Sequence, residues 1–509
     1  MQWLNNIVDE LEKKHPKGEI VVSSGVSPSG TYHLGTLREV LTAEAVSRAL
    51  KKRGRKVRHL HVVDDLDVFR KVPADVDEEF EKYLGQPLCD VPAPDGSDDS
   101  YADYFLNDLL EASKGLSLEI EVIRAHKKYR EGFFVDAIEK ALEGIEPIRA
   151  ALEEVSGRSL DKEWTPIQIV EEGYLKNRRF VSIDTSKKQL TYIDKDGKEQ
   201  VASYAHGEVK LNWRIDWPAR WWLLNVVVEP FGRDHATKGG SYDTGVVIAK
   251  DVFGIEAPLP VPYNFINRTG DTKKMSKSKG DVITVAELLK ILPAEVVWFF
   301  VIRYSPDKLL FFDQEDTLIR LVDEFSELLA KDNKTASEKQ LLELCLEGVE
   351  KQTVSNIPFS HLIASYQAAL KNPEKTLEII SRTEHVGTAE KQREIIKTEL
   401  EFIDQWLKTA APDDVKFELA DYVPKNLSDK QKDFIKALAD KVDQAPKDAD
   451  GEWFHKAIYE FKDSSGMEPK ELFVTLYKVL IGKDAGPRAG WFLSILPRDW
   501  LIKRLRLED

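Results

Sequence analysis

Two short segments of the chain carry residues that could handle a nucleotide. The first runs from Pro28 to Thr36 and includes Gly30, His33 and Gly35. Glycines let the backbone approach a bound nucleotide closely, and the start of a helix offers unpaired N–H groups to phosphate. A histidine at such a turn can also donate a hydrogen bond to a phosphate oxygen. A tight strand–helix turn with a structural histidine would have the same sequence pattern, so this segment alone leaves both interpretations open.

The second segment, at 273–280, reads KKMSKSKG and begins 240 residues after His33. Four of its first seven residues are lysines, with small hydroxyl side chains between them. Such a cationic loop suits the negative charge that develops when an α-phosphate becomes pentacoordinate and pyrophosphate leaves. The alternative is a solvated run of charge, which the interleaved Met-Ser-Lys-Ser pattern disfavours.

The residues around the first segment predict one strand–helix–strand unit. Ile20–Ser24 is a short apolar run, Thr36–Arg53 has an apolar stripe at helical spacing, and Val57–Val63 is a second apolar run. Strands that are joined in this way are parallel, which predicts a doubly wound α/β sheet. The first segment then lies at the carboxyl end of a strand, where open α/β sheets bind ligands.

The stretch 73–200 does not keep this rhythm. It contains a strand-like run at Leu118–Arg124 and a hairpin-like pair, Arg179–Ile183 and Leu190–Ile193. We interpret the stretch as an insertion in a nucleotide-binding fold. The alternation of strands and helices then returns, and beyond about Asp313 only helical stripes remain, so the rest of the chain is predicted to be helical.

Length and composition set further bounds. A chain of 509 residues predicts two to four domains. Lys and Arg total 73 and Asp and Glu total 88, a net charge of −15, which excludes a globally basic nucleic-acid-binding protein but not a local basic surface. Cys89 and Cys345 exclude a disulfide scaffold and an all-cysteine zinc site. We find no targeting signal and no apolar run of the roughly 20 residues that a membrane span needs, so we expect a cytoplasmic protein.

Together the two segments resemble the signatures of class I aminoacyl-tRNA synthetases. His33-Leu34-Gly35-Thr36 is similar to the HIGH signature, and residues 274–278 match the KMSKS signature letter for letter. Their order and separation fit the class, and the insertion lies where the class has its connective peptide.

The resemblance implies an α/β fold with a doubly wound, parallel Rossmann-type catalytic domain that carries an insertion. An all-helical C-terminal anticodon-binding domain is expected to follow it. We assign 1–72 and 201–290 to the catalytic domain, 73–200 to the inserted connective domain, 291–325 to a stem-contact and connecting region, and 326–509 to the helical domain. The implied substrates are ATP with Mg²⁺ and a tRNA; the oligomeric state stays open, with a monomer favoured.

Further blocks are similar to class I lysyl-tRNA synthetases, and this resemblance covers nearly the whole chain. The blocks are Asp64–Pro73, Lys210–Trp221, Glu229–His235, Gly239–Asp243 and Tyr304–Lys308. Core packing is the alternative role for the aromatic residues in them. The acids Asp64, Asp65, Asp216 and Glu229 leave open which carboxylate meets a lysine ε-ammonium group. Matching positions imply that L-lysine is bound by Gly25, Ser27, Asp65, Trp213, His235 and Tyr263.

The resemblance also implies the reaction, in which L-lysine is joined to tRNA(Lys) through a lysyl-adenylate and no covalent enzyme intermediate is needed. The candidate catalytic residues are His33, Lys274 and Lys277. The candidate ATP-binding residues are Pro28, Gly30, His33, Gly35, Thr36, Met275, Ser276, Lys277 and Ser278. Candidates for reading the anticodon, which could instead be core or a solvated face, are Lys483, Arg488, Trp491, Arg498, Trp500, Lys503, Arg504 and Arg506.

Two other functions compete with this one. A glutamyl- or glutaminyl-type enzyme of the same class would need an arginine aimed at the substrate carboxylate, and Arg214 and Arg233 are present. The other is a synthetase-like protein that does not charge tRNA and serves as a binding module, or a small-molecule nucleotidyltransferase with the same two motifs. Relatives often carry Cys/His zinc knuckles in the insertion, but here the insertion lacks paired cysteines. We therefore expect no structural zinc and no metal ligands.

Overall fold

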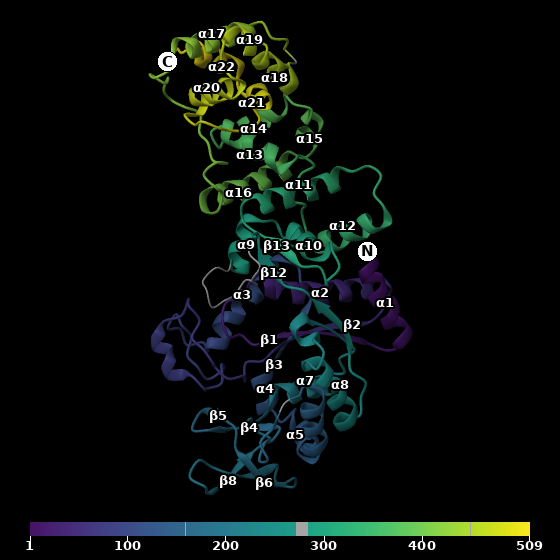
Figure 1. Cartoon of the computed structure of the whole chain (residues 1–509). Coiled ribbons are helices and arrows are strands. Elements are labelled where there is room, and N and C mark those ends of the chain that lie inside the picture. Colours follow the sequence, from purple (N-terminus) through teal and green to yellow (C-terminus); the bar gives the residue numbers. More distant parts are fainter. Residues whose placement is uncertain (158, 271–282, 448, 509) are drawn as a thin grey trace. The chain divides into compact units, whose positions relative to one another are not determined.

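The computed structural model describes residues 1–157, 159–270, 283–447 and 449–508. The chain (Figure 1) divides into two compact units. The sequence predicts one helical domain over 326–509, but Thr335–Gly348 belongs to the first unit. The first unit comprises Met1–Leu289, Val297–Phe312 and Thr335–Gly348, and the second comprises Lys290–Val296, Asp313–Lys334 and Val349–Asp509.

A five-stranded sheet of parallel strands lies at the centre of the first unit. The strand order is β11-β10-β1-β2-β3. Because the chain winds outward in opposite directions from β1 and β10, the sheet is doubly wound, as the sequence predicts. Ligands of such sheets bind in the crevice at the carboxyl ends of the strands where the direction changes. The strands are β1 (Ile20–Val26), β2 (Val57–Val63), β3 (Ile120–Arg124), β10 (Val228–Gly232) and β11 (Leu259–Tyr263).

The assignment of all of 73–200 to an insertion is wrong for β3. This strand pairs in parallel with β2, and helix α3 (Tyr101–Gly115) lies in the crossover between them. β3 is an edge strand with partly buried side chains, so its sequence lacks the continuous apolar run that marks β1 and β2. The material inserted after β3 instead forms two antiparallel sheets, one of which contains the predicted hairpin. These strands are β4 (Ile167–Glu171), β5 (Tyr174–Lys176), β6 (Arg179–Asp184), β7 (Gln189–Ile193), β8 (Glu199–Ser203) and β9 (Val209–Leu211).

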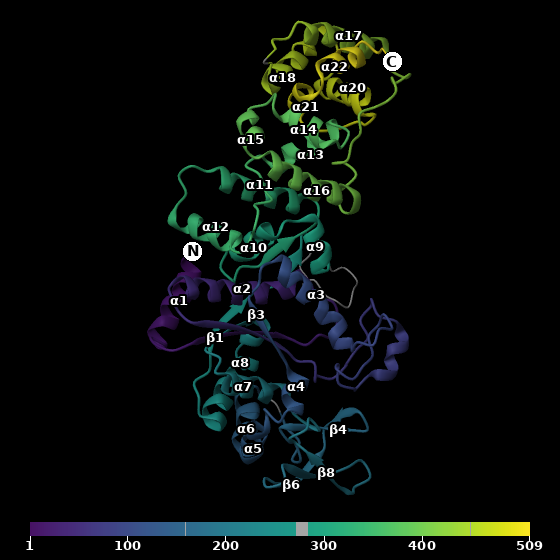
Figure 2. The same ribbon diagram turned by 180° about the vertical axis from the view of Figure 1, so that it is seen from behind.

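Helix α2 (Leu34–Lys52) joins β1 to β2 and lies against the sheet (Figure 2). It is buried on nearly every side, including the charged residue Arg38. Burying a guanidinium is costly unless it is hydrogen-bonded, and Arg38 donates to the carbonyls of Phe265, Pro306 and Lys308 at 3.0, 2.8 and 2.6 Å. Arg38 therefore fixes the loops that carry these three residues against the helix.

Residues of the first unit also belong to further helices and short strands. They are α1 (Gln2–Lys14), η1 (Glu78–Tyr83), α4 (Ala125–Arg130), α5 (Val135–Glu143), α6 (Ile145–Ala150), η2 (Ala151–Val155), α7 (Trp213–Leu224), η3 (Arg233–Ala236), α8 (Ser241–Ile248), η4 (Ala249–Phe253), β12 (Ile266–Arg268), α9 (Val285–Ile291), α10 (Ala294–Ile302), β13 (Leu310–Phe312) and α12 (Ala336–Leu346).

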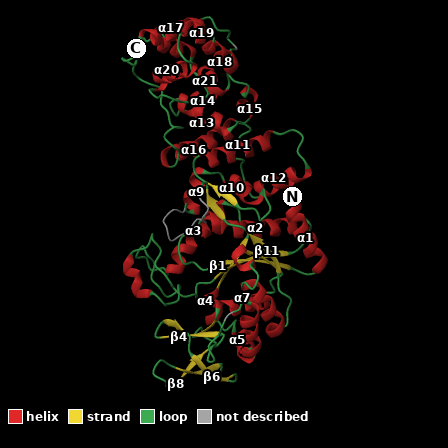
Figure 3. Cartoon of the chain, viewed as in Figure 1, coloured by secondary structure: helices red, strands yellow, loops and turns green. Residues whose placement is uncertain are grey.

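The described residues from α11 onward form helices and loops and no strand (Figure 3). The predicted stripes fall in α16 and α17, whose apolar side chains are buried. Ser428 caps α17 by accepting the N–H of Gln431. Among the described residues, no helix has the length and apolarity that a membrane span requires. The helices are α11 (Asp316–Ala330), α13 (Phe359–Ala368), α14 (Pro373–Ile380), α15 (Val386–Lys391), α16 (Arg393–Thr409), α17 (Asp429–Asp443), α18 (Gly451–Tyr459), α19 (Phe461–Ser465), α20 (Pro469–Ile481), α21 (Ala489–Ile495) and α22 (Arg498–Leu505).

Candidate active site

The turn between β1 and α2 presents His33 at the start of the helix. His33 is the N-cap residue of α2, and its Nδ1 accepts a hydrogen bond from the N–H of Thr36 at 3.3 Å. Gly35 leaves room for this imidazole, because a Cβ at position 35 would lie 2.8 Å from His33 Cε1. An isolated β-bridge pairs His33 with Thr284. The helix start and its histidine thus form a site suited to an anionic group.

A cavity of about 550 Å³ opens beside this turn. His33, Gly35 and Thr36 line it, which brings together three of the predicted ATP-binding residues. Pro28 and Gly30 belong to the same turn but do not line the cavity. The lining also includes Tyr263, Phe265 and Ile266, and it is completed on other segments by Asp67, Val68, Arg70, Lys71 and Pro73.

A second cavity, of about 410 Å³, adjoins the first. The two cavities share Gly25, Val26, Ser27, Glu39, Asp67 and Arg70. Trp213 and His235 line the second cavity, so four of the predicted lysine-binding residues meet there: Gly25, Ser27, Trp213 and His235. Tyr263, also predicted for lysine, lies in the wall of the first cavity.

Aromatic side chains form one wall of the second cavity. Trp213 and Trp217 lie one turn apart on α7, with ring centroids 6.3 Å apart. The His235 ring packs at 5.6 Å from Trp213 and 5.7 Å from Trp217, and Phe231 packs at 5.3 Å from Trp217. Trp213 is 38% exposed, so its ring is not core. A wall of this kind suits the methylenes of an extended side chain.

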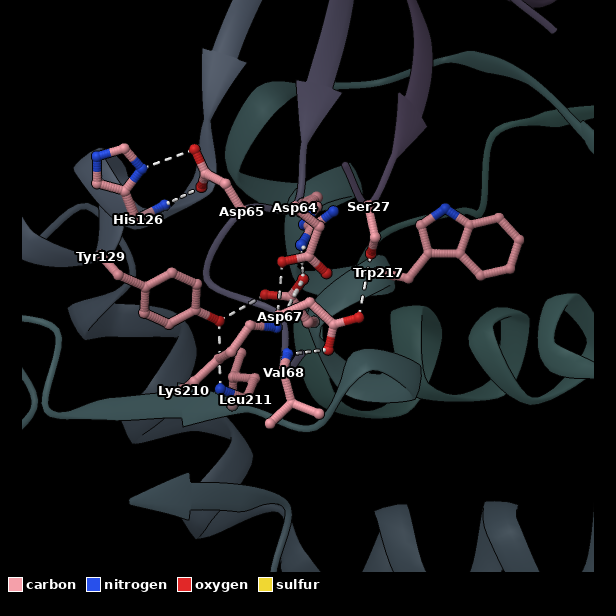
Figure 4. A network of polar contacts seen from close by, with 12 residues as sticks. Ser27, Asp64, Asp65, Asp67, Val68, His126, Tyr129, Lys210, Leu211 and Trp217 are labelled. Atoms are coloured by element: carbon pink, nitrogen blue, oxygen red, sulfur yellow. Dashed lines mark hydrogen bonds and ion pairs between the residues drawn. The ribbon is translucent and has the colours of Figure 1, made fainter. Parts of the chain in front are cut away.

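Asp65 is placed away from both cavities, contrary to the sequence-based expectation. Its carboxylate is fully buried and accepts a hydrogen bond from Arg124 Nε at 2.5 Å. It also accepts a hydrogen bond from the His126 N–H at 2.7 Å (Figure 4). Two residues after β2, the side chain turns toward β3 and the start of α4. Asp65 therefore ties these elements together, and its neighbours Asp64 and Asp67 face the second cavity instead.

Asp64 and Asp216, which line the second cavity, already have cationic partners. Arg220 contacts both Asp64, at 3.0 Å, and Asp216, and Lys210 lies 3.4 Å from Asp64. Burial works to raise the pKa of Asp64, but Arg220 and Lys210 together hold that pKa below its ordinary value. Tyr129 donates to Asp216 at 2.5 Å, which links the insertion to these acids.

Asp67 also has a cationic partner already. Both of its carboxylate oxygens accept hydrogen bonds from Arg70, at 2.7 Å each. Ser27 donates to the same carboxylate at 3.1 Å (Figure 4). This bidentate pair is charge-neutral, so Asp67 holds Arg70 and Ser27 in place at the junction of the two cavities.

Glu39 is the acid that the sequence does not single out. It lines both cavities, and its carboxylate accepts hydrogen bonds from the Gly25 N–H at 2.7 Å and from the Tyr263 hydroxyl at 2.8 Å. Burial raises the pKa of Glu39 to about 8, and the charges of Glu229 and Asp234 add to the effect. In the described part of the chain no cation pairs with this carboxylate. Only the fold reveals it, since in the sequence Glu39 reads as an ordinary helix acid.

Glu229 is the other acid in the second cavity that is held by neutral donors. Its carboxylate accepts hydrogen bonds from the indoles of Trp217, at 2.9 Å, and Trp221, at 2.5 Å, and from the Ser23 hydroxyl at 3.1 Å. Burial raises the pKa of Glu229. With three donors on its two oxygens, Glu229 positions the tryptophans of the aromatic wall, whereas Glu39 has fewer hydrogen bonds.

Five of the predicted residues fall outside the described part of the chain. They are Lys274, Met275, Ser276, Lys277 and Ser278, all within 271–282. Among the described residues there is no group of three or more His, Cys, Asp or Glu side chains that could hold a metal ion.

Comparison with known proteins adds to this geometry. A model of the family described as tRNA synthetases class I (K) matches residues 1–349, and one described as an anticodon binding domain matches residues 367–507. A protein of Archaeoglobus fulgidus named Lysine--tRNA ligase is 36% identical, with 99% of each chain covered. Lysine--tRNA ligase 1 of Methanosarcina acetivorans is 35% identical, covering 99% of this chain and 98% of its own. A solved glutamate tRNA ligase from Elizabethkingia meningosepticum covers 96% of this chain and 98% of its own, at 14% identity and a TM-score of 0.43.

Proposed function

Because the chain belongs to the family of class I tRNA synthetases (K), we propose that it is an enzyme that joins L-lysine to tRNA(Lys) with ATP. The main support for lysine as the substrate is the position of Glu39. This buried carboxyl group lines both cavities beside the aromatic wall, and no cation pairs with it among the described residues. The names of the relatives at 36% and 35% identity support the same substrate.

The charges that line the cavities favour lysine over glutamate. A glutamate site needs an arginine that is available to the substrate carboxylate. The two arginines in the second cavity, Arg70 and Arg220, already pair with Asp67 and Asp64. An ammonium group, in contrast, could pair with the ionised form of Glu39, which has no cationic partner among the described residues, and would offset the cost of burying that charge.

The proposed reaction has two steps. The lysine carboxylate attacks the α-phosphate of ATP, which forms lysyl-adenylate and releases pyrophosphate. A ribose hydroxyl at the 3′ end of the tRNA then attacks the adenylate carbonyl and releases AMP. His33 and the start of α2 bind phosphate oxygens, while Lys274 and Lys277 stabilise the departing pyrophosphate. Mg²⁺ enters with ATP as part of that substrate.

Pyrophosphate exchange against a panel of amino acids tests this function, with and without tRNA(Lys). We expect exchange that depends on lysine and not on glutamate, glutamine or arginine. Glu39→Gln should weaken lysine binding strongly, because the amide keeps the shape of the side chain but has no charge. Exchange with glutamate, or undiminished lysine binding in Glu39→Gln, would contradict the proposal. Lysylation of tRNA(Lys) completes the test.

A further inference from the structure

An ion pair stands between the two cavities of the first unit. Asp67 and Arg70 both line the first and the second cavity. Two hydrogen bonds of 2.7 Å join the Arg70 guanidinium to the two oxygens of the Asp67 carboxylate. Among the described residues, Arg70 is the only arginine or lysine that lines both cavities. A change in this pair would therefore act on the site proposed for ATP and on the site proposed for lysine.

The two partners differ in how freely they can move. The Arg70 side chain is 59% exposed, whereas that of Asp67 is 10% exposed. Arg220, the other arginine of the second cavity, is 12% exposed and contacts two acids, so it is held more firmly. A guanidinium that lies mostly in solvent loses little when it leaves one carboxylate for a stronger anion.

The backbone beside Arg70 is fixed, so the side chain alone can change its partner. Phe69 donates to the carbonyl of Gln86 at 2.8 Å and accepts the N–H of Gly85 at 2.9 Å. The Phe69 ring is fully buried and packs 4.8 Å from the ring of Tyr101. Rotation about the side-chain bonds of Arg70 is therefore sufficient to move its guanidinium, and no loop has to rearrange.

Asp67 keeps its orientation when Arg70 leaves. Its Oδ1 accepts the N–H of Val68 at 2.8 Å, and its Oδ2 accepts the hydroxyl of Ser27 at 3.1 Å (Figure 4). Each oxygen thus keeps one neutral donor, but the negative charge loses its cation. A mostly buried carboxylate without a cation is unfavourable, and an ammonium group in the second cavity would offset this cost.

The first cavity offers Arg70 a stronger anion. In the proposed function this cavity holds ATP, whose triphosphate carries several negative charges and binds guanidinium groups bidentately. Lys71, which lines only the first of the two cavities, has no carboxylate partner in the described part of the chain and adds a second cation. Movement of Arg70 toward the triphosphate leaves the charge of Asp67 facing the second cavity, which favours a cationic amino acid there.

We propose that the Asp67–Arg70 pair is a switch that makes ATP and lysine bind cooperatively. In the empty site the two side chains neutralise each other. With both ligands bound, Arg70 binds phosphate oxygens of ATP, and Asp67 binds the α-ammonium group of lysine, since the ε-ammonium group is assigned to Glu39. Both ligands are those of the proposed function, on which this switch rests.

The coupling arises because both ligands need the same ion pair to open. ATP alone must open the pair and leave Asp67 without a cation, and lysine alone must open it and leave Arg70 without an anion. When both bind, the pair opens once and each charge has a new partner. The coupling is therefore positive, and each ligand raises the affinity for the other by the same factor.

Isothermal titration calorimetry of the full-length protein tests this switch. It measures the dissociation constant of lysine with and without the α,β-methylene analogue of ATP, which cannot form the adenylate. In the wild type a saturating concentration of the analogue should lower this constant about 5- to 150-fold, the usual range for coupled sites. In Arg70→Ala the analogue should no longer strengthen lysine binding. Lysine alone should bind this variant more tightly than the wild type, because Asp67 is free from the start, whereas damage to the fold would weaken binding.

Two more variants complete the test. Asp67→Asn has no negative charge to release, so the analogue should not strengthen its lysine binding. The analogue alone should bind this variant more tightly than the wild type, because Arg70 is unpaired. Lys71→Ala is the matched control, since it removes a neighbouring cation that lines the first cavity and not the second. It should weaken binding of the analogue and leave the coupling factor unchanged.

Equal lysine affinity with and without the analogue in the wild type would overturn the switch. A coupling factor in Arg70→Ala equal to that of the wild type, or one that is lost in Lys71→Ala as well, would also overturn it. In each of these outcomes the wild type still binds lysine, so the proposed function stands. If the wild type does not bind lysine at all, the proposed function is refuted and the switch with it.

Discussion

Binding of lysine should release a proton from Glu39. In the empty site burial raises the pKa of Glu39 to about 8, with Glu229 and Asp234 adding to the effect and hydrogen bonds from Gly25 and Tyr263 opposing it. This pKa predicts that Glu39 is mostly protonated at neutral pH when no lysine is bound. An ε-ammonium group pairs with the carboxylate and not with the acid, so lysine binding is coupled to loss of this proton.

The size of the effect follows from this pKa. If only the ionised form binds, the dissociation constant for lysine rises about tenfold for each pH unit below 8 and is about 50-fold weaker at pH 6 than at pH 8. About 0.9 proton should be released per lysine bound near pH 7. The ε-ammonium group of free lysine has a pKa of about 10.4, so it stays charged over this range and does not produce the trend itself.

Isothermal titration calorimetry in buffers of different ionisation enthalpy measures both quantities. Tyr263→Phe removes a donor that lowers the pKa of Glu39, so the inflection should move to higher pH. Glu39→Gln should abolish the proton release and flatten the pH dependence. A lysine affinity that is constant from pH 6 to pH 8, with no proton released by the wild type, would refute the argument, since Glu39 would then be ionised in the empty site or would not meet the ammonium group.

Four further changes have defined outcomes. Lys277→Ala should lower the rate of adenylation in pyrophosphate exchange far more than it weakens lysine binding, because its contact strengthens in the transition state; equal losses would exclude that role. Trp213→Ala should raise KM for lysine about 10- to 100-fold and change kcat little, as expected for a wall that contacts the side chain equally in ground and transition states. Gly35→Ala should displace His33 and reduce kcat/KM for ATP while thermal stability is kept, because alanine favours the helix; retained activity would show that His33 can move without loss. Glu399 is buried in the second unit, and burial raises its pKa to about 8. The free energy of unfolding should therefore fall by up to about 5 kcal/mol as the pH rises from 4.5 through 8. Glu399→Gln should remove this loss, which thermal melts at pH 6 and pH 9 would measure.

The sequence predicts the first half of the sheet well because β1 and β2 are buried on both faces. Their apolar runs stand out, and Val57–Val63 has the predicted bounds. The strand at β3 is also predicted, but its place in the central sheet is not, because an edge strand keeps polar side chains and lacks a continuous apolar run. What distinguishes it from an insertion is its parallel pairing with β2, a contact that no local pattern contains.

The candidate site divides in the same way. Residues at a strand end or helix start, such as Gly25 and His33, are predictable because the turn itself places them at the ligand-binding edge. Asp64 and Asp65 are consecutive residues, but their side chains point in opposite directions. Asp64 pairs with Arg220, and Asp65 pairs with Arg124. Side-chain direction after a strand is decided by such tertiary partners, so sequence position alone does not separate the cavity acid from the buried one.

Helix α2 carries residues of both predicted parts of the site, the phosphate site and the lysine site. His33 caps its start and Glu39 lies six residues further on, a rise of about 9 Å along one rigid axis. A lysine whose carboxylate reacts near the phosphate site and whose ammonium group pairs with Glu39 would lie along this axis. The separation of the two ends of the substrate site is then set by a single buried helix, which Arg38 fixes to the loops around it. If lysine binds in this way, the helix would hold the phosphate site and Glu39 at a constant distance, which is what catalysis by positioning requires when the enzyme supplies no nucleophile of its own.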